Sequence, residues 1–209
     1  MKVAVFISGR GSNLQALIRA AQNPGYGAQI CLVLSDKADA GGLTLARTAN
    51  IAARAISRAD HPTKSAFEAA LTDAAEAHGA DLICLAGFMR ILSAEFVTRW
   101  RGRILNIHPS LLPGLRGLDT HARALAAGVK IHGATVHLVT ESLDDGPILA
   151  QAALAVAPDD TAESLAARVL TLEHLLYPRA LKQFIERGFS PSAFTSNQTL
   201  FNPPAEAED

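Results

Sequence analysis

The sequence predicts an α/β fold: a mostly parallel, twisted sheet with helices on both faces, a Rossmann-type first half and mixed later strands. Three observations lead to this prediction. Apolar, β-rich runs alternate with helical patterns up to about residue 107, as in parallel sheets wrapped by helices. Two further apolar runs then follow each other across a short polar loop, which favours mixed or antiparallel pairing. Hydrophobic residues make up 49% of the chain, enough for one sizeable core.

The strands of the parallel part are expected at five apolar runs. The first is continuous rather than alternating, which is typical of a strand buried on both faces. The third run is weakened by its alanines. The five runs are Val3–Ile7, Gln29–Leu34, Ile51–Ile56, Asp81–Leu85 and Arg103–Ile107.

Helices are expected between these strands, where apolar residues recur at spacings of three and four. The Lys64–His78 helix is followed by Gly79, a common C-terminal stop. The other three are Leu14–Ala21, Gly42–Ala49 and Ala94–Trp100.

After residue 108 the pattern changes. Pro109–Leu118 is a loop with two prolines and two glycines, and a helix is expected at Thr120–Ala127. Ala134–Val139 and Ile148–Val156 are expected to be strands, joined by the loop Glu141–Pro147.

The last helix is expected to begin at Asp160-Thr-Ala-Glu163, which has the form of a capping box, and to run to about Arg187. No repeat or composition break divides the chain, so we expect one catalytic domain over residues 1–189. Residues 190–209 are rich in Ser, Pro, Asn and acidic residues and are expected to form a flexible C-terminal tail.

Composition and charge argue against several classes of protein. A formal net charge of −1 and scattered basic residues give no sign of binding to nucleic acid or to an anionic membrane. No stretch approaches the roughly 18 apolar residues of a membrane helix, and the N-terminus lacks the pattern of a signal peptide. Two cysteines, Cys31 and Cys84, fit a reducing compartment. We therefore expect a cytoplasmic protein.

A glycine loop, Ser8-Gly-Arg-Gly-Ser-Asn13, joins the first strand to the first helix. A helix start presents unpaired N–H groups that attract anions, so Gly11, Ser12 and Asn13 could hold a phosphate. The alternative is a tight turn with Ser12 or Asn13 as a cap. The loop lacks the Gly-Lys-Ser/Thr ending of a P-loop and the third glycine of a dinucleotide site, where Leu14 stands. A monophosphate therefore fits better than ATP or NAD.

Asn106 and His108 end a predicted central strand, and their spacing of two puts both on one face. Ligands bind at the carboxyl ends of parallel strands. An amide N–H and an imidazolium there could together hold a developing oxyanion. The alternative is an ordinary polar strand end with a satisfied histidine.

A carboxylate near His108 would favour its charged form. Asp144 and Asp145, in the turn Leu143-Asp-Asp-Gly-Pro147, could both supply it, and spacing does not choose between them. The turn also has a purely structural interpretation, as a turn stabilised by Asp and Gly. The remaining histidines show no metal-ligand spacing, so no metal is expected.

Taken together, the segments resemble the folate-dependent glycinamide ribonucleotide formyltransferases of purine synthesis, over most of residues 1 to about 180. The motif Asn-x-His-Pro-Ser-Leu-Leu-Pro is shared by several formyl-handling enzymes, and the Ser-Gly-x-Gly-Ser-Asn start narrows the resemblance to this family. The matching segments are Ser8–Asn13, Ser35–Asp39, Leu85–Leu92, Asn106–Pro113, Gly133–His137, Leu143–Pro147 and Glu173-His174.

This resemblance implies a formyltransferase-like fold and the transfer of a formyl group from 10-formyltetrahydrofolate, a co-substrate, to the amine of glycinamide ribonucleotide. It implies that Asn106 and His108 hold the formyl oxygen, and that Asp144, rather than its neighbour, keeps His108 charged. His137 and Thr135 would support them.

The resemblance also implies how the two substrates are held. Gly11, Ser12 and Asn13 would bind the ribonucleotide phosphate, and Glu173 the ribose. The folate site would be lined by Lys64, Met89, Arg90, Ile91 and Leu92. No metal, nucleic acid or membrane is implied, and a monomer and a homodimer are both compatible.

The chain departs from the family in two places. Arg116-Gly117 is similar to methionyl-tRNA formyltransferase, and Leu170 stands where a polar residue would help to bind the nucleotide. Methionyl-tRNA formyltransferase should carry a second, basic domain, and formyltetrahydrofolate hydrolase a preceding regulatory domain; neither is expected in these 209 residues. Beyond other formyl-handling enzymes, a non-catalytic module that binds a phosphorylated metabolite remains a further alternative.

Overall fold

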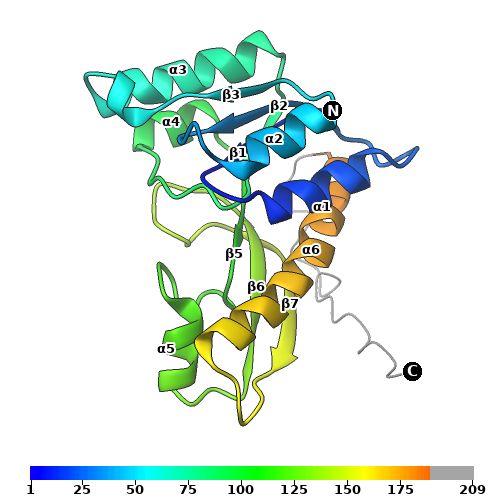
Figure 1. Ribbon diagram of the computed structural model, residues 1–209, viewed down its shortest axis with the longest axis vertical. Coiled ribbons are helices and arrows are strands. Elements are labelled where there is room, and N and C mark those ends of the chain that lie inside the picture. The colour runs from blue at the N-terminus through cyan, green and yellow to red at the C-terminus, as the bar shows by residue number, and fades with distance from the viewer. Residues whose placement is uncertain (189–209) are drawn as a thin grey trace.

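The computed structural model describes residues 1–188 and contains one seven-stranded sheet (Figure 1). The strand order is β3-β2-β1-β4-β5-β6-β7. The first five strands of this order are parallel, β6 is antiparallel to β5, and β7 is antiparallel to β6. The bounds are β1 Lys2–Ile7, β2 Gln29–Ser35, β3 Ala53–Ala55, β4 Leu82–Leu85, β5 Ile104–His108, β6 Ile131–Leu138 and β7 Ile148–Ala155. The prediction of a mostly parallel sheet with mixed later strands is confirmed.

Helices cover both faces of this sheet. The bounds are α1 Ser12–Ala21, α2 Gly41–Thr48, α3 Lys64–Ala77, α4 Ala94–Arg99, α5 Thr120–Ala126 and α6 Ala162–Glu186, with a short 3₁₀ turn, η1, at Arg58–Asp60. Figure 1 shows the sheet strongly twisted, so that β2 and β3 lie across the view while β6 and β7 run along its length. The C-terminal helix α6 crosses in front of β6 and β7.

The core is divided by the sheet into two clusters, because successive strand residues point to opposite faces. Along β1, Val3, Val5 and Ile7 belong to the cluster under α1, α2, α5 and α6. Ala4 and Phe6 belong to the other cluster, under α3 and α4. The buried part of β1, from Val3 to Ile7, therefore forms one continuous apolar run, as expected for a strand covered on both sides.

The predicted boundaries differ from the observed ones by up to three residues, and two of these differences have a clear local cause. Strand β6 begins at Ile131 rather than Ala134, because Gly133 lies inside the strand: a Cβ there would stand 1.9 Å from the Ala152 carbonyl oxygen. The capping box of α6 lies one residue later than predicted. Thr161 is the N-cap and exchanges hydrogen bonds with Ser164, whereas the Asp160 carboxylate accepts from the Ala157 N–H and from the Ser164 hydroxyl.

The topology fixes where a ligand can bind. The chain leaves β1 toward β2 on one side and later returns to β4 on the other, so the strand order reverses beside β1. In such sheets the crevice forms at the carboxyl ends of the strands at this switch point. The glycine loop follows β1, the segment 86–92 follows β4, and Asn106 and His108 end β5. The candidate residues therefore meet at one edge of the sheet.

Candidate active site

Asn106 and His108 share a face of β5, and the neighbouring strand β6 places a partner opposite each. The register pairs Asn106 with His137 and His108 with Thr135. Side chains directly opposite each other on antiparallel strands lie within contact distance. The intervening Ile107 points the other way, into the core under α6.

His137 fixes the orientation of the Asn106 amide. Its Nδ1 lies 2.9 Å from the Leu138 carbonyl oxygen, which can only accept, so Nδ1 carries the proton. Its Nε2, 3.2 Å from Asn106 Nδ2, is then a lone pair that accepts from the amide. Burial lowers the pKa of His137 and keeps it neutral, although the hydrogen bond to Leu138 and the charge of Asp144 oppose this. One amide hydrogen of Asn106 therefore donates to His137, and the second points away from this bond.

His108 is buried and has an acceptor at each ring nitrogen. Its Nε2 lies 3.0 Å from the Leu115 carbonyl oxygen, and its Nδ1 lies 3.4 Å from Asp144 Oδ2. Both ring nitrogens thus face oxygen atoms, one of the Leu115 carbonyl and one of the Asp144 carboxyl group. The structure places Asp144 beside His108, whereas Asp145 forms an ion pair with Arg116 at the surface.

Asp144 is held in place on several sides. Its Oδ2 also accepts from the Gly117 N–H at 2.9 Å, and its Oδ1 lies 3.7 Å from His137 Nε2. Its φ of 48° is in the left-handed region, which is uncommon for a residue other than glycine. Such backbone conformations persist where the surroundings enforce them, often at functional sites.

The glycine loop is built around two helix starts. Gly11 is the N-cap of α1, with φ 81°, and no side chain caps this helix, so the alternative of Ser12 or Asn13 as a cap is wrong. A Cβ on Gly11 would lie 2.7 Å from Gly42 Cα at the start of α2. Glycine is therefore required because two backbones meet here. The first N–H groups of α1 are left open to a ligand.

Asn13 and Glu173 form a buried pair that joins α1 to α6. Asn13 Nδ2 donates to Glu173 Oε2 at 2.6 Å. Burial raises the pKa of Glu173 to about 7, and the bond from Asn13 only partly offsets this. Within residues 1–188, the buried Asn13 Oδ1 has no hydrogen-bond partner.

The predicted folate segment lies between β4 and α4 and is mainly exposed. Met89 and Ile91 are 67% and 71% exposed, so they do not belong to the core. Arg90 Nε donates to the buried Asp36 at 2.6 Å. Leu92 packs against the α3 and α4 cluster.

Lys64, the fifth predicted folate residue, stands apart on α3. It is the first residue of that helix, and its Nζ lies 3.8 Å from Glu68 Oε1.

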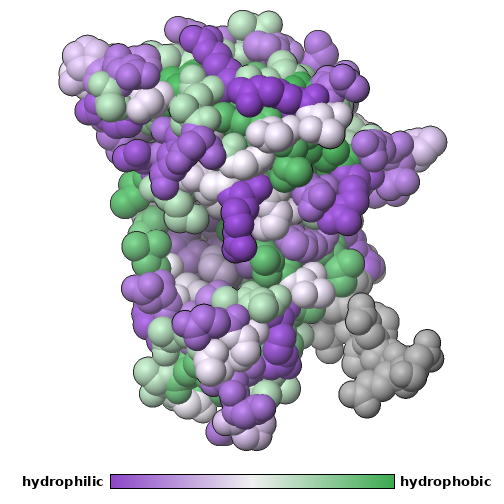
Figure 2. Space-filling model, in the orientation of Figure 1, coloured by the Kyte–Doolittle hydropathy of each residue, from purple (hydrophilic) through white to green (hydrophobic). Residues whose placement is uncertain are grey.

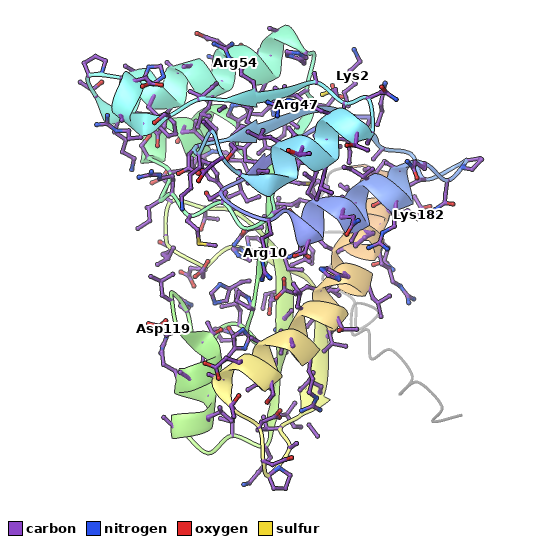
Figure 3. The ribbon with its side chains drawn as sticks, viewed as in Figure 1. Lys2, Arg10, Arg47, Arg54, Asp119 and Lys182 are labelled. Carbon is purple, nitrogen blue, oxygen red and sulfur yellow. The ribbon has the colours of Figure 1, made fainter. Side chains whose placement is uncertain are left out.

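Two segments that flank the candidate site, the glycine loop and the start of α5, can be located on the face shown in Figures 2 and 3. Figure 2 shows this face hollowed between the upper part, which carries α2 and α3, and the lower part, which carries α5. Figure 3 places Arg10 in the middle of the molecule, next to the start of α1, and Asp119 at the end of α5 that faces the upper part. The glycine loop and the start of α5 are thus on opposite sides of the hollow.

The supporting residues His137 and Thr135 were predicted, and both lie opposite the catalytic candidates on β6, but three other supporting residues were missed. Asp36 holds Arg90, and Ser110 and Gln151 bind the loop after β5. One signal was present: Gln151 is the only polar residue in the apolar strand Ile148–Ala155. Within the part of the chain that the structure describes, no group of three or more His, Cys, Asp or Glu could hold a metal ion, and no helix is long and apolar enough to cross a membrane.

The class of protein follows from this fold and from the family comparison. The model of the formyl transferase family matches residues 1–181, which is most of the chain. The chain belongs to the formyl transferase family.

Relatives narrow this further. The chain is 44% identical to phosphoribosylglycinamide formyltransferase of Escherichia coli K12 over 186 residues, which covers 89% of this chain and 88% of that protein. A crystal structure of the Brucella melitensis phosphoribosylglycinamide formyltransferase has 59% identity and a TM-score of 0.85, over 88% of this chain and 95% of that one. The trifunctional purine biosynthetic protein adenosine-3 of Bos taurus is 47% identical over 181 residues. That match covers 87% of this chain but only 18% of the trifunctional protein.

Proposed function

We propose that this protein transfers the formyl group of 10-formyltetrahydrofolate to the amine of 5′-phosphoribosylglycinamide in purine biosynthesis. The observation that carries the proposal is the cluster of Asn106, His108 and Asp144 at the carboxyl end of β5, in a chain similar over nearly its whole length to phosphoribosylglycinamide formyltransferases. The activity requires no metal and no covalent enzyme intermediate.

The proposed reaction is a direct transfer. The substrate amine attacks the formyl carbon, the new C–N bond forms, and the carbonyl oxygen becomes an oxyanion. The free N–H of Asn106 and the protonated His108 stabilise this charge, in a site preorganised by His137 and Asp144. The bond from the formyl carbon to the folate nitrogen then breaks, and the proton lost by the amine reaches that nitrogen through water near Asp144. The products are the N-formyl nucleotide and tetrahydrofolate.

The nucleotide is proposed to bind along α1 and α6. Its phosphate would accept from the open N–H groups of Gly11, Ser12 and Asn13, where the helix start supplies positive potential without a net basic protein. Its ribose hydroxyls would bind Glu173, whose carboxyl is fixed by Asn13. The unpaired Asn13 Oδ1 offers one more acceptor to a hydroxyl.

The folate is proposed to bind against the segment after β4. The exposed Met89 and Ile91 offer apolar contact for the pterin or benzoyl rings, with Leu92 behind them. Arg90, held by Asp36, and Lys64 offer positive charge to the glutamate carboxylates.

Several wider properties belong to the same proposal. We propose one catalytic domain over residues 1–189, although the predicted tail at 190–209 lies outside the described residues. We also propose that the protein is cytoplasmic and is a monomer or a homodimer. It is proposed to use no metal and to bind neither nucleic acid nor a membrane.

A spectrophotometric assay tests the activity. We expect deformylation of 10-formyltetrahydrofolate to depend on added phosphoribosylglycinamide, with one formylated product formed per folate consumed. Consumption that ignores the amine would indicate a hydrolase instead. Tight nucleotide binding without turnover would indicate a binding module.

A further inference from the structure

A row of side chains crosses three strands on one face of the sheet and ends at His108. The register places Thr135 of β6 opposite His108 of β5, and Gln151 of β7 opposite Thr135. Directly opposed residues on antiparallel strands share a face. Thr135 therefore lies between His108 and Gln151 on one face of the sheet, whereas β5 and β7 are not themselves adjacent.

Gln151 donates both of its amide hydrogens to acceptors in this row and in the loop that follows β5. Its Nε2 lies 2.8 Å from the Leu112 carbonyl oxygen and 3.0 Å from Thr135 Oγ1. The opposite orientation of the amide would bring its oxygen against a carbonyl oxygen, so the donor role is fixed by its partners.

The Thr135 hydroxyl uses its full hydrogen-bonding capacity in the same network. Its one hydrogen goes to the Ser110 carbonyl oxygen at 2.7 Å. Its two lone pairs accept from the Leu112 N–H at 3.0 Å and from Gln151. Gln151 and Thr135 together therefore fix both ends of the turn 110–112.

The 110–112 turn also positions the Leu115 carbonyl oxygen, which accepts from His108. The Ser110 hydroxyl lies 2.9 Å from the Gly114 carbonyl oxygen and 3.1 Å from that of Leu115. The Leu115 carbonyl oxygen is the acceptor of His108 Nε2. Leu115 has a φ of 52°, a conformation that needs support from its surroundings.

We propose that Gln151 is a positioning residue for formyl transfer: it holds the 110–115 turn so that the Leu115 carbonyl fixes the His108 imidazole. This inference rests on the proposed function and deepens it. Without the Gln151 donor, the buried Leu112 carbonyl loses a partner, the turn relaxes, and His108 loses its fixed orientation. Displacements of about 1 Å at reacting groups cost on the order of 100-fold in rate.

The test combines two Gln151 variants with a His108 background. Gln151→Leu removes both donors and the polar group, and Gln151→Glu keeps the size but replaces both N–H donors by acceptor oxygens. We expect both to lower kcat by roughly 10- to 100-fold, with KM for both substrates changed by less than about threefold. In the His108→Ala background the same substitutions should change kcat by less than about twofold, because the group they position is gone. Gln29→Leu, on an exposed position at the start of β2, is the matched control and should leave kcat unchanged.

A second measurement is independent of turnover. In ¹⁵N spectra of the wild-type imidazoles, the His108 Nε2–H should be protected from exchange with water, and either Gln151 variant should remove this protection. A purely structural role predicts lower thermal stability with equal losses of kcat in both backgrounds, and that result would overturn the inference. Unchanged His108 protection would also overturn it. Absence of formyl transfer in the wild type would instead refute the proposed function, because the spectra do not depend on it.

Discussion

Glu173 gives the clearest link between the structure and a measurable pH dependence. It is 7% exposed, and burial raises the pKa of its carboxyl to about 7 from an ordinary 4.5. Each pKa difference of one corresponds to about 1.4 kcal/mol, so ionising Glu173 in the folded protein costs about 3 kcal/mol more than in the unfolded chain. Because the folded pKa is the higher one, the protonated carboxyl contributes stability that is fully present below pH 4.5. This contribution is lost as the pH rises through 7.

The substitution Glu173→Gln removes the titration and keeps an acceptor for Asn13. We expect the variant to gain about 3 kcal/mol relative to wild type between pH 4.5 and pH 8, measured by urea unfolding at both values. In thermal melts this corresponds to roughly 6 to 12 °C for a domain of this size. Glu186→Gln, on an exposed position near the end of the same helix, is the control and should show no such gain. If Glu173→Gln and wild type differ equally at both pH values, the assignment of a buried, destabilised carboxylate is refuted.

Three further predictions concern strand β5, the glycine loop and a buried histidine. Asn106→Ala and His108→Ala should each lose about 10²–10³ in kcat with unchanged circular dichroism, and near-normal turnover in either would refute the oxyanion role. Gly11→Ala should destabilise the fold by about 2 kcal/mol or more in urea unfolding, because its Cβ would lie 2.7 Å from Gly42 Cα at a φ of 81°; equal stability would show that the two loops can separate. His132 has a pKa lowered to about 4, mainly by burial, so its contribution is present above pH 6.5 and is lost as the pH falls through 4. On acidification from pH 7.5 to pH 4, the free energy of unfolding should therefore fall by about 2 to 3 kcal/mol more in the wild type than in His132→Gln. Equal falls in the two proteins would contradict this.

Much of the fold could be predicted from local pattern. The continuous apolar runs of β1 and β4 reflect burial on both faces, and the change of pattern after Pro109 reflects the antiparallel β6 and β7. The early part of β6 could not be predicted, because a glycine inside a strand normally signals a break. Gly133 belongs to the strand because the neighbouring β7 backbone leaves no room for a Cβ, which is a property of the partner strand and not of the local sequence.

The candidate site was predictable only where local spacing decides the geometry. Strand spacing alone placed Asn106 and His108 on one face, and the register confirms that both face residues of β6. Spacing could not choose between Asp144 and Asp145, because the choice depends on how the turn after β6 folds back on β5. The role of Gln151 was likewise hidden, since it acts through hydrogen bonds to a turn about 40 residues away.

The bond between Asn13 and Glu173 has a consequence for the newly made chain. It joins positions 160 residues apart, so the first helix emerges from the ribosome long before its partner exists. At roughly 5 to 20 residues per second, this delay is about 10 to 30 seconds. During that time the proposed nucleotide site lacks its α6 side, so a ligand could not yet hold α1 and α6 together. Any protection against degradation from a ligand at this site therefore begins only after residue 173 has been made.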